Sequence, residues 1–228
     1  MSSGDWGVTN QANFLTEQPT RHVSAIDPEA IAETAVALQQ GQLVVFPTDT
    51  VYGVGVHAWN DAAIRQLYAV KQRSLDKGIP ILLADPEDLA KVTVHIPPQA
   101  QTHIEQFWPG PLTIIVPKHP SLPPSISPNE GIALRIPDHP VARALIRAAG
   151  GALATSSANL SNHPPALNGR EALAELGGLV AVILDDGPTP GDRPSTIVSY
   201  LGPEPVVVRQ GPIPASALNI APPGQAKS

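Results

Sequence analysis

The chain of 228 residues contains no cysteine, which excludes disulfide bridges, thiolate metal sites and cysteine nucleophiles. Aromatic residues make up only 4% of it and charged residues 15%, whereas the hydrophobic fraction of 42% is ordinary for a globular core. No uninterrupted apolar stretch approaches the roughly 18 residues that span a bilayer. The N-terminus also lacks the basic and then apolar pattern of a secretory signal. We therefore expect a soluble cytoplasmic protein without a membrane partner.

Basic charge is scarce as well. The 14 lysines and arginines are outnumbered by 20 acidic residues, giving a formal net charge of −6. A protein whose main role is to grip a nucleic-acid backbone usually carries a basic surplus. Any anion-binding site must therefore be local and set in an otherwise acidic surface. The seven histidines lack the spacing of a helical metal site, so we interpret them as surface or loop residues.

Short apolar runs alternate with amphipathic stretches along most of the chain. Strands are expected at residues 43–46, 79–84, 112–116, 132–136, 152–155, 180–184, 196–199 and 206–209. Helices are expected at residues 28–40, 61–71, 87–91, 98–107, 141–149 and 170–176. This intermingling predicts an α/β (α+β) fold. Only turn residues separate the last two strands, so the sheet should be mixed rather than all-parallel.

The chain length favours a single domain. Residues 1–20 are polar and lack periodic hydrophobic positions, which predicts a flexible N-terminal arm. The domain itself is assigned to residues 21–215, and residues 216–228 are interpreted as a C-terminal tail.

A basic segment, Lys71-Gln72-Arg73 followed by Lys77, ends one of the predicted helices. These cations could simply complement the helix dipole. They could also bind phosphate, the guanidinium as a planar fork and the ammonium as a point charge.

Arg135 lies in an otherwise apolar strand, Ile132 to Ile136. Leaving a guanidinium unpaired in a medium of low dielectric constant is costly, so Arg135 must meet an anion. That anion is either the acidic side chain of a structural salt bridge or a bound carboxylate.

Small polar side chains gather where predicted strands begin or end. Ser157 and Asn159 follow one strand, Ser195 precedes another, and Thr48 follows a third. Their hydroxyl and amide groups could donate to phosphate or carboxylate oxygens, although turns and helix caps use the same residues. Near Thr48, Gly53 and Gly55 permit a close approach of the backbone.

No segment supplies a covalent catalyst. The chain has no Gly-x-Ser-x-Gly elbow, no Gly-x-x-x-x-Gly-Lys loop and no Gly-x-Gly-x-x-Gly fingerprint, and we identify no catalytic nucleophile. Positive charge combined with hydroxyl donors suits phosphoryl or nucleotidyl transfer, in which positioning and charge neutralisation do most of the catalytic work.

Taken in order, seven motifs closely resemble the threonylcarbamoyl-AMP synthase family, which has the YrdC-like fold. They are PTDTVYGVG (47–55), KQR (71–73), WPGPLT (108–113), LRIPDHP (134–140), TSSANLS (155–161), PSTIV (194–198) and VVRQGP (207–212). The resemblance extends from about residue 28 to 214, and the chain resembles the single-domain form of the family.

The resemblance implies a twisted mixed sheet flanked by helices, with an open, positively lined concave site. It also implies a reaction in which L-threonine, bicarbonate and ATP, the last with Mg²⁺, give L-threonylcarbamoyl-AMP and pyrophosphate. The product would feed the modification of adenosine 37 in tRNA through downstream transfer proteins, and weak tRNA binding could accompany it. The residues that match ATP contacts are Lys71, Arg73, Asn159 and Arg209, and those that match threonine contacts are Thr48, Arg135, Ser157 and Ser195.

The chain departs from the family pattern at two places. Many relatives carry a histidine that touches threonine shortly after the basic segment, whereas Pro80 to Ala84 contain none here. Many also have proline directly after the Lys-x-Arg triplet, where this chain has Ser74.

Two alternative functions remain. One is an RNA-binding module of the same fold, for tRNA or double-stranded RNA, without adenylation activity. The net charge of −6 and the few aromatic residues speak against it. The other is the carbamoyl-adenylate chemistry of hydrogenase-maturation carbamoyltransferases. Those chains carry zinc-finger segments, and this chain has no cysteine.

Overall fold

The computed structural model describes residues 19–221. Of the predicted N-terminal arm, only residues 19 and 20 fall inside this range, and most of the predicted C-terminal tail also lies outside it. Within the described range, no helix is both long and apolar enough to cross a membrane.

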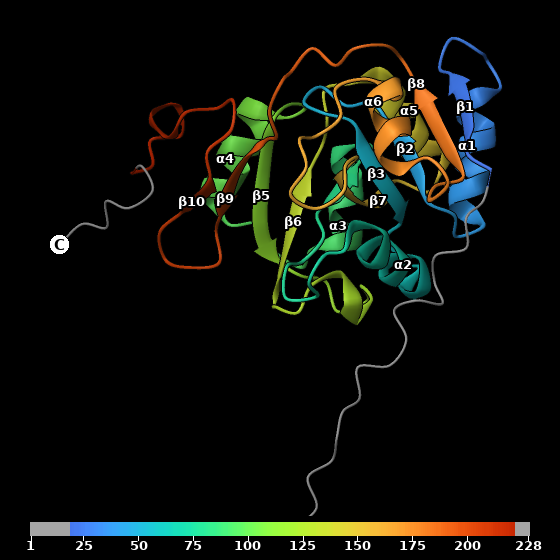
Figure 1. The fold of residues 1–228 in the computed structure, drawn as a ribbon. Coiled ribbons are helices and arrows are strands. Elements are labelled where there is room, and N and C mark those ends of the chain that lie inside the picture. Colours follow the sequence, from blue (N-terminus) through green and yellow to red (C-terminus); the bar gives the residue numbers. More distant parts are fainter. Residues whose placement is uncertain (1–18, 222–228) are drawn as a thin grey trace, which may run out of the picture.

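A mixed sheet of ten strands forms the centre of the molecule (Figure 1). The strands are β1 Arg21–Ser24, β2 Val44–Phe46, β3 Gly53–His57, β4 Ile81–Leu83, β5 Leu112–Pro117, β6 Gly131–Arg135, β7 Ala152–Ser157, β8 Val182–Asp185, β9 Thr196–Ser199 and β10 Val206–Arg209. Their spatial order is β1-β8-β2-β3-β7-β4-β6-β5-β9-β10. The pairs β1–β8, β2–β8, β4–β6 and β5–β9 are parallel, and the other neighbouring pairs are antiparallel. The predicted mixed sheet is confirmed.

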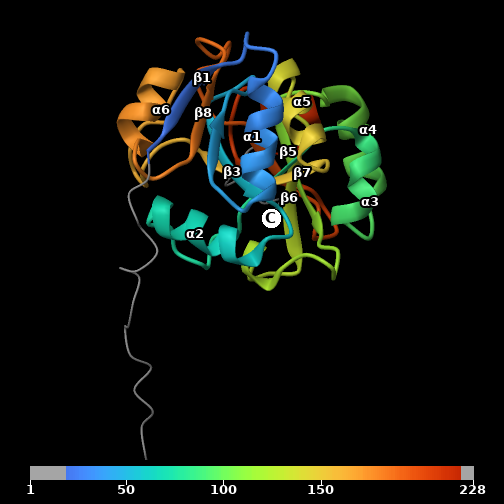
Figure 2. The same cartoon turned by 90° about the vertical axis from the view of Figure 1, so that its right-hand side faces the viewer.

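Helices cover both faces of the sheet (Figures 1 and 2). They are α1 Ala30–Gln39, α2 Asp61–Lys71, α3 Leu89–Val92, α4 Pro98–Phe107, α5 Pro140–Ala148 and α6 Gly169–Leu176, with 3₁₀ turns at Pro86–Asp88, Pro124–Ile126 and Ala215–Leu218. Apolar residues of α2, α4 and α6 form one core with one face of the sheet. Apolar residues of α1 and α5 form a second core with the opposite face.

The strand β2 shows why the predicted strands read as continuous apolar runs. Val45 joins the core under α2, α4 and α6, whereas Val44 and Phe46 join the core under α1 and α5. Successive side chains of a strand point to opposite faces, so a strand covered on both sides must be apolar at every position. The α1–α5 pair covers only part of its face of the sheet.

Two strands were not predicted from the sequence. The edge strand β1 is short and mostly exposed, so it lacks an apolar signal. The strand β3 contains Gly53 and Gly55, which resemble turn residues. A Cβ at Gly55 would lie 2.9 Å from Phe46 Cε1 and 3.1 Å from Thr155 Oγ1, so glycine is needed there because side chains of both neighbouring strands lie across β3. The close approach expected at these glycines therefore involves neighbouring side chains.

The helix α2 has the predicted bounds, and the side chain of Asn60 caps it by accepting a hydrogen bond from the backbone N–H of Ala63. The C-terminal boundary of the domain differs from the predicted one. At the C-terminal end, Leu218 and Ile220 are buried in the main core, so the packed chain continues beyond residue 215.

Candidate functional site

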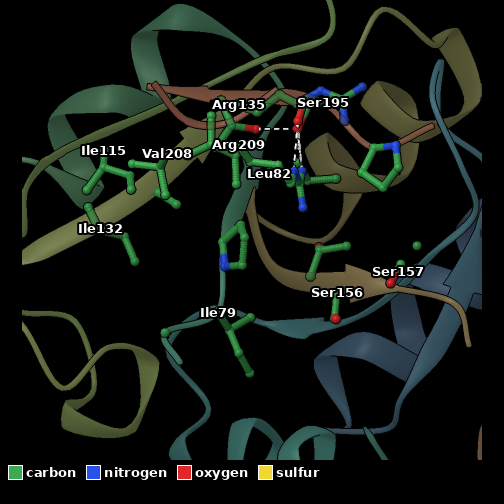
Figure 3. Close-up of a pocket in the computed structure, with 18 of the residues that line it drawn as sticks. Ile79, Leu82, Ile115, Ile132, Arg135, Ser156, Ser157, Ser195, Val208 and Arg209 are labelled. Atoms are coloured by element: carbon green, nitrogen blue, oxygen red, sulfur yellow. Dashed lines mark hydrogen bonds between the residues drawn. The ribbon is translucent and has the colours of Figure 1, made fainter. Parts of the chain in front are cut away.

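The uncovered part of the α1–α5 face forms a cavity of about 380 Å³ (Figure 3). Its floor consists of side chains from the strands between β3 and β10. The loops around Thr48, Arg73 and Pro194 contribute to its wall. Six of the eight predicted site residues line this one cavity, namely Thr48, Arg73, Arg135, Ser157, Ser195 and Arg209. The fold therefore gathers segments that are more than 150 residues apart in the sequence.

The guanidinium of Arg135 is buried and held from three sides. Its Nε donates to the carbonyl oxygen of Gly110 at 2.9 Å, and its Nη1 donates to Thr50 Oγ1 at 2.9 Å. Its Nη2 donates to the carboxylate of Asp49, forming an ion pair with both side chains almost fully buried. Three of the five guanidinium N–H groups are thus used within the protein, which leaves two for a ligand. Arg135 therefore forms a structural salt bridge and also lines the cavity.

The other two guanidiniums of the cavity are held only by uncharged acceptors. Arg73 donates through Nε to the carbonyl oxygen of Lys77 at 3.0 Å and through Nη2 to that of Gly78 at 2.9 Å. Arg209 donates to the carbonyl oxygen of Ser195 from Nε at 3.1 Å and from Nη2 at 2.8 Å. Within residues 19–221, neither arginine forms an ion pair.

The three guanidiniums are close enough to influence one another. Desolvation lowers the pKa of Arg209, and the positive charges of Arg135 and Arg73 lower it further. Like charges raise one another's free energy when they are brought together, and a bound polyanion relieves this repulsion. No Asp or Glu side chain of the described chain lines the cavity. It is therefore electropositive within an acidic protein.

Hydroxyl groups form a second polar feature of the cavity. Ser156 and Ser157 at the end of β7 line it, and within the described residues their hydroxyls make no hydrogen bond to protein (Figure 3). Across the cavity, the hydroxyl of Ser195 lies 2.7 Å from that of Thr113 and accepts a hydrogen bond from Arg209 Nη2 at 3.3 Å. Thr113 was not singled out from the sequence, because a threonine inside a strand is ordinary in a sheet.

Thr48 uses its hydroxyl to shape its own turn. It donates to the carbonyl oxygen of Val51 at 2.6 Å and accepts from the backbone N–H of Thr50 at 3.2 Å. The turn presents Asp49 and Thr50 to Arg135. Sequence reasoning gave no role to these two residues, although they lie between Thr48 and the next strand.

Lys71 and Asn159 do not line the cavity. The Lys71 ammonium is buried behind the end of β7, where it donates to the carbonyl oxygen of Ser157 at 2.7 Å and to both oxygens of Asn159. Burial, together with the positive charge of Arg73, lowers the pKa of Lys71 to about 8. The side-chain amide of Asn159 donates to the carbonyl oxygens of Leu160 and His163. In this structure both predicted ATP contacts therefore support the wall of the cavity from behind.

An apolar half completes the cavity. It was not predicted, because an apolar strand residue indicates burial without showing which face it occupies. The residues that line it include Ile79, Leu82, Ile115, Ile132 and Val208 (Figure 3).

The chain matches the Sua5/YciO/YrdC family, described as telomere recombination, over residues 36–211. A threonylcarbamoyl-AMP synthase of Bacillus subtilis is 40% identical over 196 residues, which cover 85% of this chain and 56% of that protein. A putative threonylcarbamoyl-AMP synthase of Mycobacterium tuberculosis is 39% identical over 199 residues, which cover 85% of this chain and 91% of that protein. The chain thus spans little more than half of some relatives and nearly all of others.

Solved structures agree with this assignment. The crystal structure of Pyrococcus abyssi Sua5 complexed with L-threonine superimposes with a TM-score of 0.84 at 31% identity, covering 89% of this chain and 60% of that one. Escherichia coli YciO, at 22% identity and a TM-score of 0.77, shares the fold and covers 88% of this chain and 98% of its own. The predicted YrdC-like fold is confirmed, and the chain belongs to the Sua5/YciO/YrdC family.

Proposed function

We propose that this protein is an L-threonylcarbamoyladenylate synthase, a nucleotidyltransferase that forms threonylcarbamoyl-AMP and pyrophosphate from L-threonine, bicarbonate and ATP. The observation that carries this proposal is the single cavity in which the guanidiniums of Arg73, Arg135 and Arg209 converge. Such a site neutralises a triphosphate and leaves donors for a carboxylate. Relatives bearing this name, at about 40% identity, support the same activity.

The reaction needs no protein nucleophile. The amine of threonine adds to bicarbonate with loss of water, which gives an N-carboxylated amino acid. One carbamate oxygen then attacks the α-phosphorus of ATP, and the bond to the leaving pyrophosphate breaks. In this scheme Arg135 holds the threonine carboxylate, whereas Arg73 and Arg209 bind the phosphate oxygens. The free hydroxyls of Ser156 and Ser157 lie on the same wall and are placed to orient the reacting groups.

We propose that Mg²⁺ enters with ATP. Among the described residues, no cluster of three or more histidine, aspartate or glutamate side chains could hold a metal ion, and no carboxylate lines the cavity. The donor set therefore fits a metal carried mainly by phosphate oxygens and water, as is usual for Mg²⁺ with nucleotides. When bound, the ion would neutralise part of the triphosphate charge.

The experiment that tests the activity is pyrophosphate release. Release should require all three substrates and should stop when either threonine or bicarbonate is omitted. Release that continues without threonine would reject the proposal. Tight, steeply salt-dependent tRNA binding in the absence of substrates would instead favour an RNA-binding module.

The variant Arg135→Ala distinguishes threonine binding from ATP binding at the proposed site. We expect it to abolish threonine-dependent pyrophosphate release while ATP binding is retained. Equal loss of both would contradict a carboxylate-binding role for Arg135.

The product would be consumed by proteins that transfer the threonylcarbamoyl group to adenosine 37 of tRNA. Weak tRNA binding by this chain is part of the same proposal. Pull-down of a transferase only in the presence of substrates would support a product hand-over between the two proteins.

A further inference from the structure

The three cavity arginines differ in how their charge is balanced. Arg135 is paired with the carboxylate of Asp49. Arg73 and Arg209 donate only to carbonyl oxygens and to the hydroxyl of Ser195, and no carboxylate of the described chain lies within ion-pair distance of either. The cavity thus contains one neutralised guanidinium and two uncompensated ones.

This difference is built into the fold. Arg135 lies on β6, an inner strand, and Asp49 lies in the turn that the hydroxyl of Thr48 organises. The exposed fraction of the Arg135 side chain is 6% and that of Asp49 is 10%, so water screens their attraction poorly. Asp49 does not line the cavity and therefore does not reach a ligand directly.

We infer that Asp49 is a positioning residue that sorts the two anionic substrates between the arginines of the cavity. Its negative charge cancels that of Arg135 and makes this guanidinium a poor site for a triphosphate. The two free N–H groups of Arg135 still match the two oxygens of a carboxylate, because this contact depends on directed hydrogen bonds. The triphosphate then binds to Arg73 and Arg209. The assignment of the threonine carboxylate to Arg135 rests on the proposed function, whereas the charge argument does not.

The test uses inorganic tripolyphosphate as the probe, with binding measured by calorimetry at low salt. Asp49→Asn keeps the shape of the side chain and an acceptor for Arg135 but removes the charge. We expect this variant to bind tripolyphosphate about threefold to tenfold more tightly than the wild type, since a third uncompensated cation then faces the cavity. Unchanged or weaker binding by a folded Asp49→Asn variant would overturn the inference.

Two further variants make the result specific. Glu204→Gln removes the same charge from an exposed turn between β9 and β10, and it should leave the affinity within about twofold of the wild type. The double variant Asp49→Asn with Arg135→Gln removes both charges of the pair and should also bind as the wild type does. If Asp49→Asn alone does not fold, the double variant tests the inference in its place. Binding more than about tenfold weaker by the double variant would show that Arg135 already holds the polyanion.

Turnover gives an independent readout. In the wild type, tripolyphosphate should compete with ATP and not with threonine. In Asp49→Asn it should compete with both, so the apparent KM for threonine should rise with tripolyphosphate concentration. Absence of threonine-dependent turnover in the wild type would reject the proposed function. The calorimetric test of the charge argument would remain valid. If Asp49→Asn turns over and tripolyphosphate still competes with ATP but not with threonine, only the sorting role is rejected.

Discussion

The ammonium of Lys71 lies 2.7 Å from the backbone carbonyl oxygen of Ser157, so a buried cation supports the strand end that carries the free hydroxyls of the cavity. We predict that Lys71→Met acts first on the structure. Three oxygen acceptors lose their donor, which should lower the free energy of unfolding by about 1–3 kcal/mol. Thermal unfolding and pyrophosphate release should both decline. Full stability with lost activity would instead indicate direct contact of Lys71 with ATP.

Arg209→Lys keeps the positive charge but loses the double hydrogen bond to the carbonyl oxygen of Ser195. We expect the KM for ATP to rise about tenfold, the equivalent of roughly 1.4 kcal/mol, while the KM for threonine stays unchanged. Steady-state kinetics with each substrate varied in turn measures both constants. Arg65→Lys, at an exposed pair with Asp61, is the matched control and should change neither.

Gly55→Ala should destabilise the sheet, because the added Cβ would lie 2.9 Å from Phe46 Cε1. The expected loss is about 1–3 kcal/mol in urea-induced unfolding. Phe46→Leu in the same chain should restore part of it by vacating this space. Gly202→Ala is the control, since the nearest atom to its added Cβ is 3.8 Å away. A Gly55→Ala protein as stable as the wild type would show that β3 shifts without cost.

Protonation of His103 should weaken the fold as the pH falls. His103 is a buried residue of α4, so the interpretation of the histidines as surface or loop residues is wrong for it. Its Nδ1 lies 2.5 Å from the hydroxyl of Tyr200, and burial lowers the pKa of His103 below its usual value near 6.5. The unfolded chain therefore takes up a proton more readily than the folded chain. The stability that neutral His103 contributes is present above about pH 6.5 and is lost as the pH falls below it.

Urea-induced unfolding at pH 7.5 and 5.5 tests this expectation. The pKa values of His57 and His139 are also lowered by burial, so the wild type alone cannot isolate His103. The decisive comparison is with His103→Gln, which should lose less stability between the two pH values than the wild type does. An equal loss in both proteins would contradict the assignment.

The sequence indicated the class of fold and most of its elements because buried strands and capped helices leave periodic signals. The helix α4, Pro98–Phe107, is predicted with its observed bounds, since proline opens it and a proline–glycine segment follows it. The strand β3 was missed because its glycines are required by side chains of the neighbouring strands. A Cβ at Gly53 would lie too close to Thr155, and one at Gly55 too close to Phe46. Local patterns do not record such contacts.

The candidate site, like the fold, could be predicted from the sequence only in part. Residue types alone identified Arg135 as needing an anion, but they could not tell that Asp49 supplies one. Lys71 was placed correctly at the end of a helix, yet the sequence does not state that its side chain turns inward to Asn159. The direction in which a side chain points depends on tertiary contacts, which a local sequence pattern does not determine.

The position of Arg135 on an inner strand has a consequence for the design of inhibitors. The neighbouring strands β4 and β5 restrain the backbone of β6 on both sides, whereas Arg73 follows a helix and Arg209 lies on the edge strand β10. A compound anchored by a carboxylate at Arg135 should therefore meet the same geometry with or without nucleotide, and chemical variation is best directed toward the two outer guanidiniums.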